Sequence, residues 1–190
     1  MERYKKIYDA LFNAAKNGFE SLFKQHNENF YYCALIMMEV STPCIAAISE
    51  ESLQHVLDDN CADENEKNES IAEYKWSYAD SPYCGYGFNE YFREVENLFN
   101  DDVWDENIED DEYESRVSDW LKIMTEVMND LDEKGVFNFC KDRSKLFINA
   151  ELQPPEDTTN LENARKLNNN EMFSEWFEDN KEEYEFDDDE

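Results

Sequence analysis

Two short apolar runs, joined by a proline-containing turn, constrain the fold of this chain more than any other feature. Residues 30–38 are aromatic and aliphatic over the length of one strand, and residues 44–48 form a second such run. The segment 40–43 between them suits a hairpin connection, and Pro43 suits a strand start. Residues 145–152 predict a third strand, because Leu146 and every second residue after it are apolar.

Five other stretches carry apolar residues at helical spacing, so each predicts a helix with one buried face. These stretches are residues 4–23, 49–57, 88–99, 113–131 and 170–177. Ser49 and the run 168–170 are predicted N-caps, and Gly135 marks a predicted helix end. The stripes that contain Leu11, Phe92 and Leu121 should pack on the sheet, because apolar faces have to be buried together.

The predicted fold class is α+β, with a small, mostly antiparallel sheet packed with about five helices. A chain of 190 residues is long enough for one substantial core, whereas two full domains would be cramped. Residues 1–180 are therefore predicted to form a single domain with acidic surface loops, and residues 181–190 an acidic tail that frays. An aromatic content of 15% separates the chain from disordered acidic proteins, which are poor in aromatics.

Acidic residues gather in three stretches of the chain. Residues 58–73, 101–114 and 178–190 hold 7, 9 and 9 of the 48 acidic residues, and the formal net charge of the chain is −31. Such a field repels nucleic acid and anionic membranes, and it attracts basic proteins or multivalent cations. The stretch 58–73 has no sustained period and is predicted to be a solvated surface loop.

The apolar pattern and the cysteines indicate the cellular location of the protein. The N-terminal segment is amphipathic and lacks the apolar core and small-residue cleavage site of a signal peptide. The longest apolar run, residues 30–38, is about half of the ~20 residues that a membrane helix needs. Five cysteines without a Cys-x-x-Cys pair fit reduced thiols better than a disulfide framework. We therefore expect a soluble, cytoplasmic protein without membrane partners.

Side chains suited to catalysis or metal binding are few and scattered. His26 and His55 are the only histidines, and neither has a serine or cysteine beside it in a recognisable nucleophile setting. The cysteines and histidines lack zinc spacing, and the segment 101–112 has Glu106 where a calcium loop needs glycine. No glycine-rich phosphate loop occurs in the sequence. We expect no catalytic residue, no metal and no cofactor, and therefore not an enzyme.

A polar and aromatic group around Trp76 is the one candidate pocket. Trp76, Tyr78 and Tyr83 lie close in sequence to Asp80, and such side chains are common at binding sites and interface anchors. The same pattern also suits a corner of the core with polar tips at its edge. In either case Trp76 should be buried, and Asp80 should accept backbone hydrogen bonds that hold the turn at 77–82.

The segment that contains Trp76 also carries a family resemblance. Residues 74–83, Tyr-Lys-Trp-Ser-Tyr-Ala-Asp-Ser-Pro-Tyr, resemble the Arg-Trp-Ser-x-x-Asp-type signature of the bacterial domain-of-unknown-function family 4303. The predicted hairpin and helix over 30–53, the segment 134–149 with Arg143, and Leu167-Asn168 are similar to flanking elements of that family. The resemblance covers about residues 5–178, and Lys75 stands where the family pattern has arginine.

The resemblance implies a genomic context and not a particular reaction. The family has no established catalytic residues, and its members are similar to proteins that are encoded beside polymorphic toxins and are regarded as immunity proteins. Genomic association of this kind raises an expectation about function without identifying a site.

The leading interpretation is a non-catalytic, cytoplasmic immunity-type protein that binds and neutralises a basic, nucleic-acid-targeting toxin domain. Long-range attraction between an acidic inhibitor and a basic cleft would speed their association. The stretch 101–114 is the predicted interface, because it contains no base and lies between two amphipathic helices. Its predicted partner-binding residues are Asp101, Asp102, Trp104, Asp105, Glu106, Glu109, Asp110, Asp111 and Glu112.

Two alternatives stay open at the level of sequence. One is a small-ligand-binding or enzymatic domain with a pocket around Trp76, Asp80 and Tyr83. The other is an acidic surface that maintains solubility in a protein with a structural or regulatory role.

Overall fold

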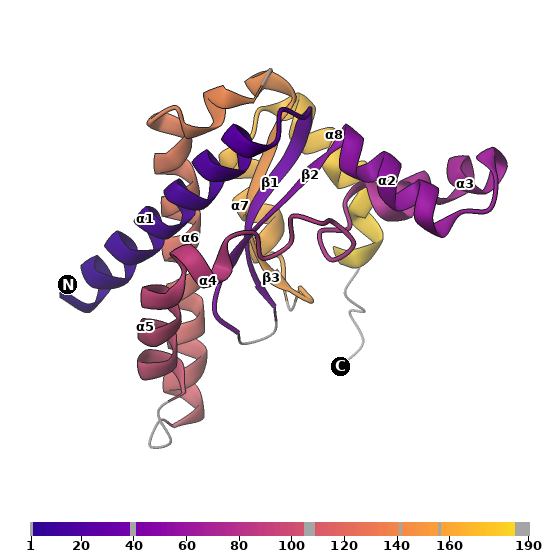
Figure 1. Ribbon diagram of the computed structural model, residues 1–190. Coiled ribbons are helices and arrows are strands. Elements are labelled where there is room, and N and C mark those ends of the chain that lie inside the picture. Colours follow the sequence, from indigo (N-terminus) through magenta and orange to yellow (C-terminus); the bar gives the residue numbers. More distant parts are fainter. Residues whose placement is uncertain (1, 39–40, 105–108, 141, 156, 185–190) are drawn as a thin grey trace, which may run out of the picture.

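The computed structural model describes residues 2–38, 41–104, 109–140, 142–155 and 157–184, which form a three-stranded sheet flanked by helices (Figure 1). The strands are β1 (Phe30–Met38), β2 (Cys44–Ser49) and β3 (Phe147–Gln153). The α-helices of these residues are α1 (Glu2–Gln25), α2 (Glu50–Asn60), α3 (Glu64–Lys75), α4 (Phe88–Tyr91), α5 (Arg93–Val103), α6 (Asp110–Glu133), α7 (Thr159–Leu167) and α8 (Asn170–Asn180). Short 3-10 helices are η1 (Val136–Phe139), η2 (Arg143–Lys145) and η3 (Lys181–Tyr184). The predicted α+β class is confirmed.

The sheet is mixed rather than mostly antiparallel. Its strand order is β2-β1-β3: Cys33 of β1 lies opposite Ala47 in an antiparallel hairpin and opposite Ile148 in a parallel pairing. Parallel neighbours need a long crossover, and the helices between β2 and β3 supply it. Phe137, just after α6, packs on Phe19 in the second half of α1 with ring centroids 5.2 Å apart. The chain therefore returns to the end of the sheet where β1 begins, and β3 runs parallel to β1.

One face of the sheet packs against α1 and α6, and α5 packs on these two helices (Figure 1). Leu35 of β1 and Ile148 of β3 point to this face and are fully buried. Leu11, Phe92 and Leu121 are buried in the same cluster, so the predicted packing of their three stripes on the sheet is confirmed. Burying one such large apolar side chain stabilises a fold by about 1.5–3 kcal/mol.

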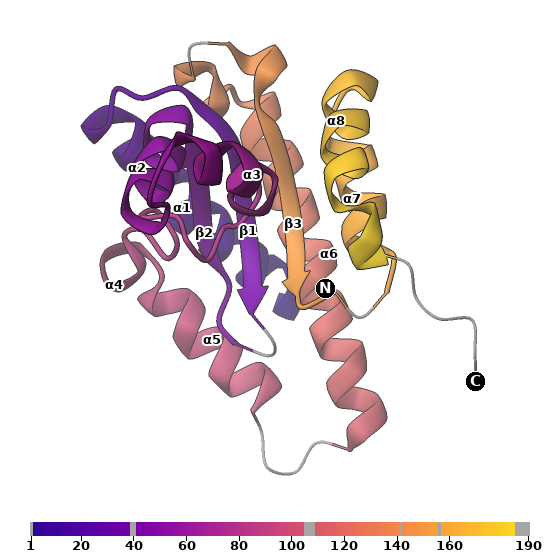
Figure 2. The same ribbon diagram turned by 90° about the vertical axis from the view of Figure 1, so that its right-hand side faces the viewer.

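The opposite face packs against α7, α8 and the C-terminal end of α3 (Figure 2). Tyr32 and Phe147 lie on this face, and Trp176 of α8 stacks on Phe147 with ring centroids 5.0 Å apart. Because successive strand residues point to opposite faces, Asn149 and Glu151 of β3 share this face with Phe147. A polar strip therefore lies under α7 and α8.

The outer edge of β3 is closed by asparagine side chains instead of a fourth strand. Every second residue of a parallel strand points both its amide and its carbonyl away from its neighbour. On β3 these groups bond to asparagines: Asn168 with Ile148 (2.8 and 2.7 Å), Asn160 with Leu152 (2.9 and 2.7 Å) and Asn163 with the carbonyl of Ala150 (3.0 Å). All three come from α7 or the residue that follows it, so α7 covers an edge that would otherwise be open to another chain.

Helix boundaries follow the predicted caps. The hydroxyl of Ser49 accepts a 2.8 Å hydrogen bond from the amide of Ser52 at the start of α2. Asn169 accepts 3.0 Å bonds from the amides of Glu171 and Met172 at the start of α8. Helix α6 ends before Gly135, which has a φ of 76° that favours glycine.

The prediction of about five helices is matched roughly but not exactly, because the described residues contain eight. The stretch 58–73, predicted as a loop, contains most of α3. Its N-cap Asp63 accepts bonds from the amides of Asn65 (2.9 Å) and Glu66 (3.1 Å). Helix α3 buries none of its residues, so a cap rather than an apolar stripe marks its start. The predicted stripe 88–99 bends at Phe92 into α4 and α5.

Helix α7 is the third difference from the predicted helices, after α3 and the division of one predicted helix into α4 and α5. It was missed because buried asparagines, Asn160 and Asn163, stand on the inner face where an apolar stripe would be expected.

Candidate functional site

Trp76 is the centre of the candidate site. It caps the C-terminal end of α3 and is 8% exposed, as predicted. Its ring lies on the second face of the sheet, with centroids 6.2 Å from Tyr32 and 5.7 Å from Phe147. Its indole Nε1 donates a 2.9 Å hydrogen bond to Oδ2 of Asp179 on α8.

Asp80 and Tyr83 do not join Trp76 in one pocket, and this corrects the predicted grouping. Ser81 donates to the carbonyl of Ala47 (2.5 Å), and the amide of Gly85 donates to the carbonyl of Ile45 (2.9 Å). These bonds hold the segment against the free edge of β2, so the chain passes from one face of the sheet to the other.

On the far side of that edge, Tyr83 belongs to the core of the first face. Its hydroxyl donates a 2.6 Å bond to Glu28 and lies 3.1 Å from Nδ1 of His26. Asp80 is exposed, and its carboxylate accepts a 2.5 Å bond from the hydroxyl of Ser77 rather than the predicted backbone bonds.

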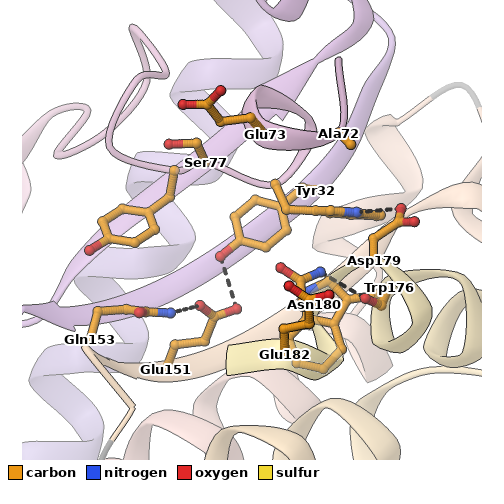
Figure 3. A pocket seen from close by; sticks show the side chains of 12 residues that line it. Tyr32, Ala72, Glu73, Ser77, Glu151, Gln153, Trp176, Asp179, Asn180 and Glu182 are labelled. Carbon is orange, nitrogen blue, oxygen red and sulfur yellow. Dashed lines mark hydrogen bonds between the residues drawn. The ribbon is translucent and has the colours of Figure 1, made fainter. Parts of the chain in front are cut away.

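A cavity of about 360 Å³ opens beside Trp76, between the second face of the sheet, the end of α3 and α8 (Figure 3). Of the four predicted pocket residues, Trp76 and Tyr78 line it. The full lining consists of Tyr32, Ala72, Glu73, Trp76, Ser77, Tyr78, Glu151, Gln153, Trp176, Asp179, Asn180 and Glu182. Four of these residues are acidic, four are aromatic and none is basic.

Glu151 lies at the floor of this cavity and is only 3% exposed. Its Oε1 accepts hydrogen bonds from the hydroxyl of Tyr32 (2.9 Å) and Nδ2 of Asn149 (3.1 Å). Its Oε2 accepts a 2.8 Å bond from Nε2 of Gln153, and Figure 3 shows Tyr32 and Gln153 directed at the carboxylate. Acceptance at both oxygens is the pattern of an ionised carboxylate. Burial, and then the negative charge of Glu151, raise the pKa of Tyr32 well above its ordinary value, so its hydroxyl stays a donor.

Asp179 supplies a second carboxylate on the opposite wall. Besides Trp76, it accepts a 2.6 Å hydrogen bond from Nζ of Lys75, which also pairs with Glu175 at 3.1 Å. Burial by itself raises the pKa of Asp179, but the bonds from Lys75 and Trp76 outweigh burial and lower the pKa below its ordinary value. The side chain is therefore ionised at neutral pH.

Tyr32, Glu151, Trp176 and Asp179 are site residues that sequence reasoning missed. Only one signal pointed to them: polar Asn149 and Glu151 occupy alternate positions of a strand whose other positions are apolar. Such alternation normally indicates a solvated face. Here α7 and α8 cover that face, so the polar positions are buried.

The acidic stretch 101–114 divides into inward and outward side chains. Asp102, predicted to bind a partner, is turned inward, and its side chain is only 12% exposed. Arg3 donates to its two carboxylate oxygens (2.6 and 2.7 Å), and the indole of Trp120 donates at 2.9 Å. Asp102 therefore ties α1 and α6 to the end of α5, and it is not available as a partner contact.

Trp104 is the outward member of this stretch. It follows α5, is 55% exposed, and its ring centroid lies 6.3 Å from that of Tyr113. Asp101 and Glu109 are exposed beside it in sequence, whereas Glu112 pairs with Arg116 at 2.6 Å. The other predicted members fall outside the described part of the chain: residues Asp105 and Glu106, and the side chains of Asp110 and Asp111.

Other chemistry in the described residues is sparse. No group of three or more histidine, cysteine or acidic side chains among them is arranged to hold a metal ion. All five cysteines are free, and neither His26 nor His55 lines the cavity. None of the helices in the described ranges is long and apolar enough to cross a membrane.

Comparison with known proteins identifies a family. The model of the family described as "Domain of unknown function (DUF4303)" matches residues 11–169. This range is most of the chain, so the protein belongs to that family. No curated protein and no solved structure matches it.

Proposed function

We propose that this protein is a non-catalytic, cytoplasmic immunity-type protein that binds and neutralises a basic toxin domain. The observation that carries the proposal is Trp104, a 55% exposed tryptophan within the acidic stretch 101–114 of a chain with a net charge of −31. Exposed aromatic anchors surrounded by charge are typical of protein interfaces. The similarity of the family to proteins encoded beside toxins supports a toxin domain as the partner.

The two parts of this surface have different physical roles in binding. Carboxylates such as Asp101 and Glu109 act over long distances and mainly increase the association rate of a basic partner. Trp104 acts at contact, where burying its ring lowers the dissociation rate. Asp102 has no place in this interface, because Arg3 and Trp120 occupy its carboxylate.

The proposal predicts a toxin domain encoded beside the gene for this protein, and the test uses that domain. Trp104→Ala should weaken its binding by about 2 kcal/mol, the cost typical of an interface hot spot. The pair Asp101→Asn and Glu109→Gln should slow association several-fold at low salt, and the difference should shrink near physiological salt, where the screening length is about 8 Å. Stopped-flow fluorescence of Trp104 measures the association rates of the charge variants, because the other three tryptophans are buried. Isothermal titration calorimetry measures the affinity of Trp104→Ala, which lacks this fluorophore.

A matched control removes two exposed acids at a distance from Trp104, Asp59→Asn on α2 and Glu69→Gln on α3 (Figure 1). This pair should change the association rate much less than the Asp101/Glu109 pair. Equal effects of the two pairs would mean that only net charge matters. A toxin domain that binds all variants alike, with unchanged protection of cells, would reject this surface.

A further inference from the structure

We propose that the cavity beside Trp76 binds an organic cation, a protonated amine or a guanidinium group. The site is distinct from the proposed toxin interface and does not depend on it. Its lining joins a buried carboxylate to aromatic rings and carries further carboxylates at its rim, without a lysine, arginine or histidine among its twelve residues (Figure 3).

The charge of the walls selects a cation. Glu151 at the floor accepts hydrogen bonds at both oxygens, and Asp179 is held by Lys75 and Trp76 in its ionised form. Glu73 and Glu182 add exposed carboxylates at the rim. A negative potential focused by low-dielectric walls raises the local concentration of cations and repels anions.

The aromatic walls select an organic cation rather than a metal ion. Tyr32, Trp76, Tyr78 and Trp176 line the cavity, and rings of this kind attract ammonium and guanidinium groups. The ring of Trp76 already holds one cation in this way, because Nζ of Lys75 lies 4.8 Å from its centroid. Hard metal ions instead need several converging oxygen ligands, and the described residues hold no group of three or more acidic, histidine or cysteine side chains arranged for a metal ion.

The size of the cavity agrees with a small ligand or a single side chain. Its volume of about 360 Å³ lies at the lower end of the range of roughly 300–1,000 Å³ that is usual for ligand pockets. An alkyl chain that carries the cation can lie along the rings, while its charged end reaches the carboxylates.

The experiment follows the four indole N–H signals by NMR in about 150 mM salt, where weak surface attraction is screened. The probes are agmatine and 1,4-diaminobutane, and 1,4-butanediol is the neutral control. Agmatine or the diamine should shift the Trp76 and Trp176 signals to saturation, whereas the diol should not. Trp104, in the acidic stretch, is the internal control for nonspecific attraction and should shift much less.

Substitutions of the cavity carboxylates test whether these side chains bind the cation that causes the NMR shifts. Glu151→Gln keeps the shape of the floor but removes its charge, and it should weaken binding roughly tenfold. The rim pair Glu73→Gln and Glu182→Gln should also weaken binding, and it serves if the buried substitution impairs folding. Asp101→Asn, outside the cavity, should bind like the unaltered protein.

Comparing the two free cations with a peptide shows whether the bound cation belongs to a small molecule or to a protein side chain. If a blocked Gly-Arg-Gly peptide shifts the same signals, the cation comes from a protein side chain; if only agmatine or the diamine does, it is a free small molecule. The proposal is overturned if no probe shifts Trp76, if the diol binds equally well, or if both the floor and the rim variants bind like the unaltered protein.

Discussion

Asp102 shows how one side chain of an acidic surface serves the fold instead of a partner. Its carboxylate receives bonds from Arg3 on α1 and from Trp120 on α6. Burial alone raises the pKa of Asp102, but these hydrogen bonds outweigh burial and lower the pKa below its ordinary value. The ionised form is thus favoured by folding, and its contribution to stability depends on pH.

Asp102→Asn should lower the free energy of unfolding at pH 7 by about 1–2 kcal/mol. This is toward the low end of what hydrogen bonds to charged groups contribute, because Arg3 is partly exposed to solvent. A lowered folded-state pKa stabilises above the unfolded-state pKa of about 3.9, and this contribution is lost as pH falls through the folded-state value. The difference in free energy of unfolding between the unaltered protein and Asp102→Asn should therefore be constant from about pH 7 to 5. It should disappear as the pH falls below about 4. Urea unfolding at several pH values measures it.

The neighbouring substitution Asp101→Asn is the control, because Asp101 is exposed and carries the same charge. In about 150 mM salt, where surface repulsion is screened, it should leave the free energy of unfolding nearly unchanged at every pH. A gap for Asp102→Asn that is equally large at pH 7 and pH 3 would contradict the assigned role of its charge.

At the scale of elements, the contact between α7 and β3 is the least expected feature. Three side-chain amides replace the hydrogen bonds that a fourth strand would make to Ile148, Ala150 and Leu152. Loss of one amide leaves buried backbone groups without a partner, which is costlier than the hydrogen bond itself. The packing of α7 therefore depends on asparagine and not only on apolar contact.

Asn160→Ala should lower the free energy of unfolding by about 1–3 kcal/mol, because it leaves both the amide and the carbonyl of Leu152 unpaired. Hydrogen exchange of the Leu152 amide should accelerate in the same variant. Asn97→Ala, at an exposed position of α5, is the matched control and should be neutral or slightly stabilising. Equal stability of the two variants would show that water replaces the Asn160 amide without cost.

At the scale of the whole molecule, the net charge of −31 opposes compaction. Ion pairs such as Arg143 with Asp132 (2.6 Å) and Lys67 with Asp58 (2.7 Å) work in the other direction. Exposed pairs contribute about 0–1 kcal/mol each, and with 17 basic residues against 48 acidic ones most acids have no basic residue to pair with. Repulsion should therefore outweigh the pairs.

Raising NaCl from about 10 mM to 500 mM should increase the melting temperature, because the screening length falls from roughly 30 Å to less than 8 Å. The Asp59→Asn and Glu69→Gln pair should melt at a higher temperature than the unaltered protein in low salt and approach it in high salt. A melting temperature that falls with added salt would show that the ion pairs dominate. Differential scanning calorimetry at several salt concentrations measures this.

The candidate site was only partly predictable. Trp76 and Tyr78 were identified, because aromatic residues near turn formers are an unusual local pattern. Asp80 and Tyr83 were grouped with them because they are close in sequence, but the hydrogen bonds of Ser81 and Gly85 to β2 carry Tyr83 to the opposite face. Glu151 and Asp179 come from distant elements, and no local pattern joins them to Trp76.

The sequence by itself determined the features that depend on neighbouring residues: three strands, the helices with apolar stripes, and the caps at Ser49 and Asn169. Periodicity and capping act within one element, so they can be read locally. Only the tertiary structure decided the parallel direction of β3, the seating of α7 on its edge and the burial of Glu151. Each of these depends on which distant surfaces pack together, because a buried polar group is tolerated only where its partners arrive from other elements.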